Sequence, residues 1–168
     1  ILNVATLKAK VEIASIFNDN MVLQQQMDVN IWGTASPNKK VTIQPTWTST
    51  VFSTTSDKNG KWKTKISTPE AGGPYHIKIS DGEEKVLSNI LIGEVWLCSG
   101  QSNMEFYLNW SATAAQDVPQ AANSNIRFYD MKARWRTDAV EWDASVLDSL
   151  NHLQYYKDTQ WTVCSPET

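Results

Sequence analysis

Ser102 has the strongest potential for chemistry in this sequence. It follows a long apolar run, and Gly100 lies two positions before it. A serine on a tight turn after a buried strand projects its hydroxyl from the edge of a sheet, where a substrate carbonyl can approach. Backbone N–H groups of such a turn can stabilise the oxyanion that forms when the hydroxyl attacks an ester. The spacing is not Gly-x-Ser-x-Gly, and the same residues also occur in ordinary turns, so both interpretations stay open on spacing alone.

A serine nucleophile needs a base within hydrogen-bonding reach, and the sequence has two histidines, His76 and His152. His76 lies in the middle of a predicted strand, which favours a structural role on a sheet. His152 lies in residues 130–160, a polar and aspartate-rich stretch that is typical of a long irregular loop. We therefore assign the base to neither histidine. No set of His, Cys, Asp and Glu has metal-ligand spacing, and we predict no metal site.

The first ninety residues predict a domain of short antiparallel strands. Several segments alternate apolar and polar residues, as strands with one buried face do. These segments are residues 29–33, 40–44, 61–66 and 75–79. The turn signal Asp57-Lys58-Asn59-Gly60 predicts a hairpin between residues 50–55 and 61–66, and a second turn signal is Asp81-Gly82. Strands and turns at this density are typical of an antiparallel β-sandwich.

The pattern changes near residue 90. The run from Ile90 to Cys98 is nearly all apolar, which predicts a strand buried on both faces, as in a parallel α/β sheet. Ser102 is then expected on an exposed turn at the carboxyl end of this strand. A helical segment at 111–122 and a short strand at 125–129 follow. Because a parallel sheet needs more strands than these, the α/β part is predicted to be incomplete.

The two cysteines, Cys98 and Cys164, cannot form a disulfide framework. A single bridge between them is one alternative, but two separately buried thiols are favoured. Cys98 in particular is expected to be a buried free thiol, because it belongs to the apolar run.

Composition excludes two classes of partner. The formal net charge is −3 and no run of Lys and Arg exists, so a nucleic-acid partner is not expected. No apolar run approaches the roughly 20 residues of a membrane-spanning helix.

Trp32, Trp47 and Trp62, three of eight tryptophans, could form a sugar-stacking face. We favour the alternative in which each strand buries one tryptophan in the core.

The residues around Ser102 carry a family resemblance. The segment Gly93-Glu94-Val95-Trp96-Leu97-Cys98-Ser99-Gly100-Gln101-Ser102-Asn103-Met104-Glu105 closely resembles the nucleophile block of the sialate O-acetylesterases, which are carbohydrate esterases of the SGNH/GDSL class. The resemblance extends to Ile16–Gln25, Ala71–Tyr75 and Trp161–Thr168, in the family's order. It implies a β-sandwich-like domain at residues 1–90 and the N-terminal part of an α/β/α SGNH-hydrolase domain at residues 91–168.

The resemblance also implies a function and a set of roles. Ser102 would attack the O-acetyl ester of a sialic acid, and its backbone N–H would be one oxyanion donor. The histidine, the acidic residue and the other oxyanion donors would lie beyond Thr168, so the expected partners are an O-acetylated sugar and the remaining C-terminal part of the esterase domain. Gln101 and Asn103 would shape the turn or contact substrate, although capping the following helix is a structural alternative. No cofactor is implied.

Two other functions are compatible with this sequence. An esterase for acetyl xylan or another acetylated sugar is an alternative, and so is a non-catalytic carbohydrate-binding module made of the β-domain. The 168 residues alone are expected to lack esterase activity. Residues 1–10 lack a signal-peptide pattern, as either a mature exported protein or a cytosolic protein would. Of these two, a secreted or periplasmic location is our expectation.

Overall fold

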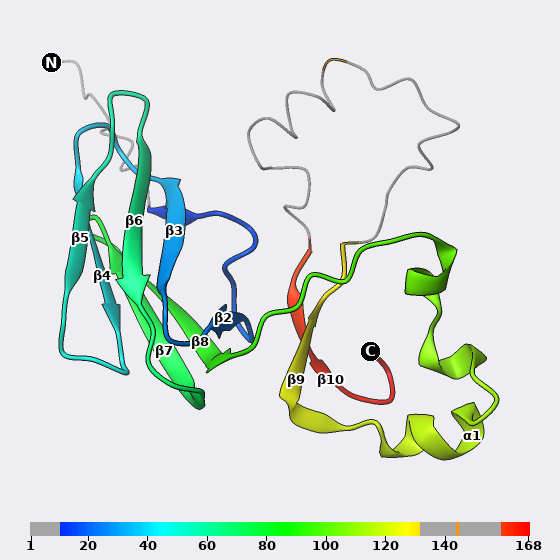
Figure 1. The fold of residues 1–168 in the computed structure, drawn as a ribbon. Coiled ribbons are helices and arrows are strands. Elements are labelled where there is room, and N and C mark those ends of the chain that lie inside the picture. The colour runs from blue at the N-terminus through cyan, green and yellow to red at the C-terminus, as the bar shows by residue number, and fades with distance from the viewer. Residues whose placement is uncertain (1–10, 132–143, 145–158) are drawn as a thin grey trace, which may run out of the picture.

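The structure is a computed structural model, and it describes residues 11–131, 144 and 159–168. The first part of the chain forms eight strands in two sheets (Figure 1). The strands are β1 (Glu12–Ile13), β2 (Val22–Gln24), β3 (Asp28–Thr34), β4 (Lys40–Pro45), β5 (Phe52–Thr55), β6 (Lys61–Ser67), β7 (Gly72–Ser80) and β8 (Glu84–Gly93). One sheet has the strand order β1-β3-β6, and the other has the order β2-β8-β7-β4-β5.

Both sheets contribute side chains to one hydrophobic core, as the alternating pattern predicts. In β4, Val41 and Ile43 are fully buried, whereas Lys40 and Gln44 are exposed. In β6, Trp62 is buried between exposed lysines. The favoured interpretation of the tryptophans is confirmed for Trp62 and holds only in part for the other two: Trp32 and Trp47 are half-buried and pack against the core, and Trp47 lies after the end of β4. Trp32 meets Phe17 edge-on with ring centroids 4.7 Å apart.

The predicted hairpin between residues 50–55 and 61–66 is wrong. The turn itself forms, because the Asp57 carboxylate accepts hydrogen bonds from the backbone N–H groups of Asn59 and Lys61, both at 2.8 Å. However, β5 pairs with β4, and β6 pairs with β3 over seven residues. The chain therefore crosses from one sheet to the other at this turn. A local turn signal reverses the chain direction but does not select the partner strand, which the shared core decides.

The five-stranded sheet is mixed, which the antiparallel expectation missed. Strands β7 and β8 are an antiparallel pair, and the predicted turn at Asp81-Gly82 lies between them. On its other side β8 pairs in parallel with β2, with Gln24 opposite Gly93. Two segments that resemble the same esterase family, Ile16–Gln25 and Gly93–Glu105, are thereby brought side by side.

Beyond β8 the chain forms short helices and one strand pair. These elements are the 3-10 helices η1 (Ser102–Glu105), η2 (Leu108–Trp110) and η3 (Val118–Gln120), the helix α1 (Ala114–Asp117), and the strands β9 (Asn123–Tyr129) and β10 (Trp161–Cys164). Helical turns within residues 111–122 and a strand at 125–129 are therefore confirmed. Strand β10 was not expected; it pairs antiparallel with β9.

The predicted buried strand from Ile90 to Cys98 is wrong beyond Gly93, where β8 ends. Val95, Trp96 and Leu97 are 45%, 82% and 81% exposed. A strand needs a neighbour to bond its backbone, and in the described part of the chain no strand runs beside residues 94–100. The apolar composition of a segment favours burial, but it does not provide the neighbouring strand that burial in a sheet requires.

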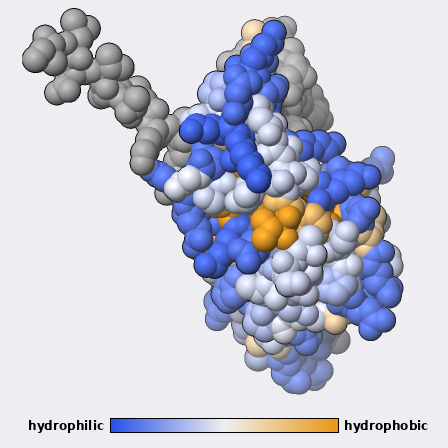
Figure 2. All heavy atoms as spheres, turned by 90° about the vertical axis from the view of Figure 1, so that its left-hand side faces the viewer, coloured by the Kyte–Doolittle hydropathy of each residue, from blue (hydrophilic) through white to orange (hydrophobic). Residues whose placement is uncertain are grey.

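Figure 2 views the molecule from the β5 side of Figure 1. This face is mostly hydrophilic, and one small hydrophobic area interrupts it. None of the helices in the described ranges is long and apolar enough to cross a membrane.

The burial of Ile43 predicts how much stability its truncation should cost. Ile43 is 0% exposed in β4, so Ile43→Ala should lower the free energy of unfolding by about 2–5 kcal/mol through lost burial and a residual cavity. Urea denaturation followed by circular dichroism measures this change. Val51→Ala is the control, because Val51 is 53% exposed and its loss should change stability by less than about 0.5 kcal/mol. Equal effects of the two substitutions would contradict the placement of the core.

Candidate functional site

Ser102 is exposed and begins the single-turn helix η1. The expectation of an exposed turn is confirmed, although the preceding residues are not a strand. The turn is closed by the Met104 N–H, which donates to the Gln101 carbonyl at 2.8 Å. The Met104 side chain packs against Gly100, where a Cβ would lie 2.5 Å from Met104 Cγ. A larger residue at position 100 would therefore displace this exposed methionine side chain.

The residues beside Ser102 are also exposed. Gln101 precedes the helix with an extended backbone and makes no side-chain capping bond, so the capping alternative is wrong for Gln101. Asn103 lies within the turn of η1. Both side chains are accessible to a ligand, and their roles stay predictions.

The described residues place no base beside the Ser102 hydroxyl. His76 is exposed on β7, as expected for a structural histidine, and its backbone N–H donates to the Thr46 hydroxyl at 3.0 Å. His152 lies outside the described residues. In the described ranges no group of three or more His, Cys, Asp and Glu side chains is arranged to hold a metal ion.

Both cysteines are free, so the alternative of a bridge between them is wrong in this structure. The expectation that Cys98 is buried is also wrong, because this thiol is exposed. The reason is the missing strand neighbour described above. Cys164 is half-buried in β10, and its thiol donates to the Ala121 carbonyl at 2.9 Å.

The chain segment that leads to Ser102 is held at its start by three side chains, which we call the Gln24–Gln25–Glu94 cluster. The Glu94 carboxylate accepts from Gln24 Nε2 at 3.0 Å and from Gln25 Nε2 at 2.6 Å. The Gln24 side-chain oxygen accepts from the backbone N–H of Val95 at 2.9 Å. The Gln25 side-chain oxygen accepts from the N–H of Ala71 at 2.9 Å. Each amide thus uses both its donor and its acceptor.

This arrangement has an electrostatic consequence. The hydrogen bond from Gln24, and then the one from Gln25, lowers the pKa of Glu94 below its usual value of 4.5. Both amides donate to the ionised carboxylate, which favours the charged form. Glu94 is therefore the acceptor at the centre of the cluster at neutral pH.

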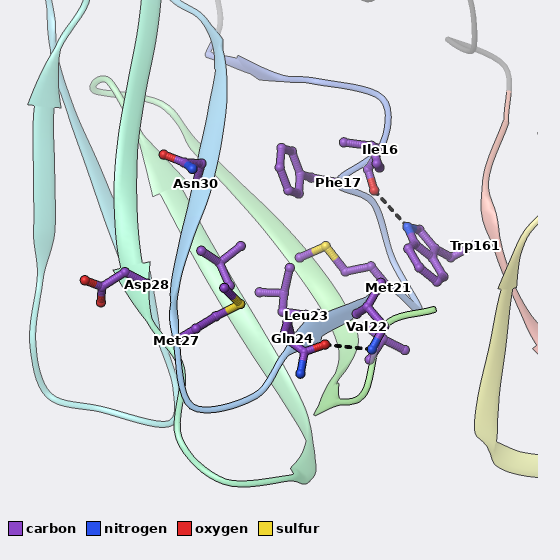
Figure 3. Close-up of a pocket in the computed structure, with 12 residues that line it drawn as sticks. Ile16, Phe17, Met21, Val22, Leu23, Gln24, Met27, Asp28, Asn30 and Trp161 are labelled. Atoms are coloured by element: carbon purple, nitrogen blue, oxygen red, sulfur yellow. Dashed lines mark hydrogen bonds between the residues drawn. The ribbon is translucent and has the colours of Figure 1, made fainter. Parts of the chain in front are cut away.

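A second contact holds the other end of the same region. The backbone N–H of Trp161 in β10 donates to Asn18 Oδ1 at 3.0 Å. The Trp161 indole N–H donates to the Ile16 carbonyl at 2.8 Å (Figure 3). Asn20 Nδ2 donates to the Trp161 carbonyl at 3.5 Å. The Trp161 ring lies 5.4 Å from that of Tyr129 in β9, so this contact also fixes the β9–β10 pair.

A mainly apolar groove of about 320 Å³ lies between these two contacts (Figure 3). Val95 and Trp161 line it from the second part of the chain, and Met21, Leu23 and Met27 line it from the first. The segment Ile16–Gln25 therefore contacts both ends of the region that contains Ser102. Sequence reasoning placed Gln24, Gln25 and Glu94 inside the family-like segments but did not foresee that they bond to one another.

The region around Ser102 exposes many apolar side chains. Aromatic rings cluster within it, with the centroids of Tyr107 and Trp110 4.8 Å apart. The exposed apolar residues are Val95, Trp96, Leu97, Met104, Phe106, Tyr107, Leu108, Trp110, Ile126, Phe128 and Met131. We call this set the apolar face of residues 95–131. So much exposed apolar surface is typical of a surface that contacts another protein segment or a ligand.

Known proteins resemble this chain. It is 31% identical over 164 residues to the sialate O-acetylesterase of Homo sapiens, and the match covers 86% of this chain and 31% of that protein. The sialate O-acetylesterase of Pongo abelii is 27% identical over the same shares of both chains. The predicted resemblance to the sialate O-acetylesterase family is confirmed. The chain spans about a third of the length of these sialate O-acetylesterases.

A solved structure shares the fold. It is the crystal structure of a carbohydrate acetylesterase from Xanthomonas citri, with a TM-score of 0.71 and 24% identity. The match covers 94% of this chain and 33% of that one. No protein-family model matches the chain.

The exposure of Cys98 predicts its reactivity. In the native protein Cys98 should react with a maleimide faster than the half-buried Cys164, because access limits the reaction of a thiol. Peptide mapping by mass spectrometry after timed labelling measures both rates, and Cys98→Ser should remove the fast phase. Labelling of Cys98 only after denaturation would contradict its exposure.

The low pKa of Glu94 predicts a pH dependence. Because the ionised form accepts the hydrogen bonds, their contribution to stability is present above pH 4.5 and is lost as the pH falls through the lowered pKa. The carboxyl carbon of Glu94, followed by NMR, should titrate with a midpoint below 4.5. Gln24→Ala should move the midpoint up, whereas Gln116→Ala, at an exposed position in α1, should not. A midpoint at or above 4.5 in the unchanged protein would show that the cluster does not form.

Proposed function

We propose that this chain belongs to a carbohydrate acetylesterase and carries its nucleophile, Ser102. The observation that carries the proposal is the exposed Ser102 turn within a segment that resembles the sialate O-acetylesterase nucleophile block. The names of the relatives support an acetylated sugar as the substrate class. The finer proposal is an O-acetylated sialic acid, since the curated relatives carry that name.

The chemistry is acyl transfer to water. Ser102 Oγ attacks the acetyl carbonyl while a base removes the hydroxyl proton, and the carbonyl oxygen becomes an oxyanion. The backbone N–H of Ser102 is one proposed donor to that oxyanion. The sugar hydroxyl leaves with a proton, and water then attacks the acetyl-enzyme to release acetate and restore Ser102. Gln101 and Asn103 flank the reacting atom and are proposed to contact the substrate or keep the turn in shape.

The base and the remaining oxyanion donors are proposed to lie in a protein segment outside these 168 residues. Two observations support this division. The relatives are about three times as long as the matched segment, and the apolar face of residues 95–131 is open to solvent. We propose that this segment completes an α/β/α SGNH-type domain over the apolar face, beside a β-sandwich-like domain. The proposed location of the complete protein is secreted or periplasmic.

Two alternatives receive less support. An esterase for acetyl xylan or another acetylated sugar would use the same serine and differ only in its specificity pocket, so a panel of substrates separates it from the sialate enzyme. A non-catalytic sugar-binding β-module would need exposed aromatic faces. Trp62 is only 3% exposed, and Trp47 packs against Tyr75 at 5.5 Å, which argues against a stacking face.

Acetyl-ester hydrolysis tests the proposal. The complete natural protein should hydrolyse p-nitrophenyl acetate and O-acetylated sialic acid, and Ser102→Ala should lower kcat by up to about a million-fold. The 168 residues alone should show no activity above background, because a serine hydroxyl without a base is a poor nucleophile.

Ser99→Ala is the matched control, since Ser99 is exposed in the same segment and has no proposed role. Unchanged activity of Ser102→Ala would overturn the nucleophile assignment. Substantial activity of the 168 residues alone would overturn the proposal that the base lies elsewhere.

A further inference from the structure

The Gln24–Gln25–Glu94 cluster joins the first part of the chain to the segment that leads to Ser102. Gly93 ends β8, and the chain then continues without regular structure to the turn at Ser102. At this exit the Gln25 N–H donates to the Gly93 carbonyl at 2.9 Å, and Val95 donates to the Gln24 side chain. The direction in which the segment leaves the sheet is therefore set by Gln24 and Gln25, at the end of β2.

The end of β2 and the turn after it, which carry the two glutamines, are held by a buried side chain. Thr68 is 8% exposed, and its hydroxyl lies 2.7 Å from the Gln24 carbonyl and 3.2 Å from the Met27 N–H, which donates to it. The Gln26 N–H donates to the Pro69 carbonyl at 2.9 Å. Because Thr68 restrains the backbone on both sides of Gln25, the two glutamines are held where both of their amides can donate to Glu94.

We infer that Gln24, Gln25 and Glu94 are positioning residues for the Ser102 segment, acting through the direction of the chain at Val95. The inference rests on the proposed function of Ser102. None of the three side chains is assigned a contact with substrate. Acyl transfer depends on the angle and distance of attack, and a misplacement of about 1 Å can cost a hundred-fold in rate. Removing the hydrogen bonds that hold Glu94 and Val95 should therefore lower kcat more than it changes KM.

A charge-swap pair provides a sharp test. Gln24→Glu places two carboxylates together and removes one hydrogen-bond donor. Glu94→Gln replaces one carboxylate oxygen by an NH₂ group, which then faces the NH₂ group of a glutamine without an acceptor between them. The double variant Q24E/E94Q restores every bond: the amide of residue 94 donates to residue 24, and Gln25 and Val95 keep their acceptors. Glu83→Gln is the control, because Glu83 is an exposed acid at the β7–β8 turn.

The variants are made in the complete natural protein, and two quantities are measured. With an acetyl ester as substrate, each single variant should lower kcat by about ten- to a hundred-fold with KM within about twofold, and the double variant should recover to within about threefold. Hydrogen exchange at the Val95 amide should be faster in each single variant and return to the original rate in the double variant. The control should change neither quantity.

The outcomes separate this inference from the proposed function. Unchanged kcat in both single variants, or no recovery in the double variant, would overturn the positioning role while Ser102→Ala still abolishes activity. Unchanged exchange at Val95 would overturn the cluster itself, whatever the activity. If Ser102→Ala left activity intact, the proposed function would fail. In that case, lower kcat values in the cluster variants would not support a role in positioning Ser102.

Discussion

The backbone N–H groups of Val95 and Trp161 both donate hydrogen bonds to side-chain oxygens of one short segment, Ile16–Gln25. The acceptors are Gln24 and Asn18, about seventy and about 140 residues away in the sequence. Backbone donors at such junctions need partners, because an unpaired group costs free energy when it is shielded from water. These two bonds, with the carboxylate of Glu94, connect the strands of the first part to the region that contains Ser102.

The segment Ile16–Gln25 contacts both the hydrophobic core and the second part of the chain. Phe17, Met21 and Leu23 are 7%, 1% and 4% exposed and belong to the hydrophobic core. The polar residues between and after them, Asn18 and Gln24 among them, face the second part of the chain. The core therefore restrains the backbone from which the polar side chains extend.

The surface around Ser102 differs from that of the sheets. The face seen in Figure 2 is largely hydrophilic, as expected for a surface in water, whereas residues 95–131 expose aromatic and aliphatic side chains. The two restraints described above hold both ends of this apolar region. Under the proposed function, Ser102 would gain its base and its shielding from water from a segment that covers the apolar face. Restraint of the region and covering of the face would then be separate requirements for activity.

The sequence by itself determined the local features. Alternation predicted the buried faces of β4 and β6, the Asp57–Gly60 turn formed as its residues indicate, and Ser102 lies on an exposed turn after Gly100. These features depend on neighbours within a few residues, which a pattern records. The resemblance to sialate O-acetylesterases came from the residue types around Ser102 and was confirmed by the relatives.

Only the tertiary structure decided which strands pair and what residues 94–100 do. The hairpin expected between 50–55 and 61–66 does not form, because β6 pairs over seven residues with β3 in the three-stranded sheet. The strand expected up to Cys98 failed because no described strand lies beside it, and Val95 bonds to Gln24 instead. In each case the deciding partner is distant in the sequence, so hydrophobicity indicates that a segment needs a neighbour without specifying which one.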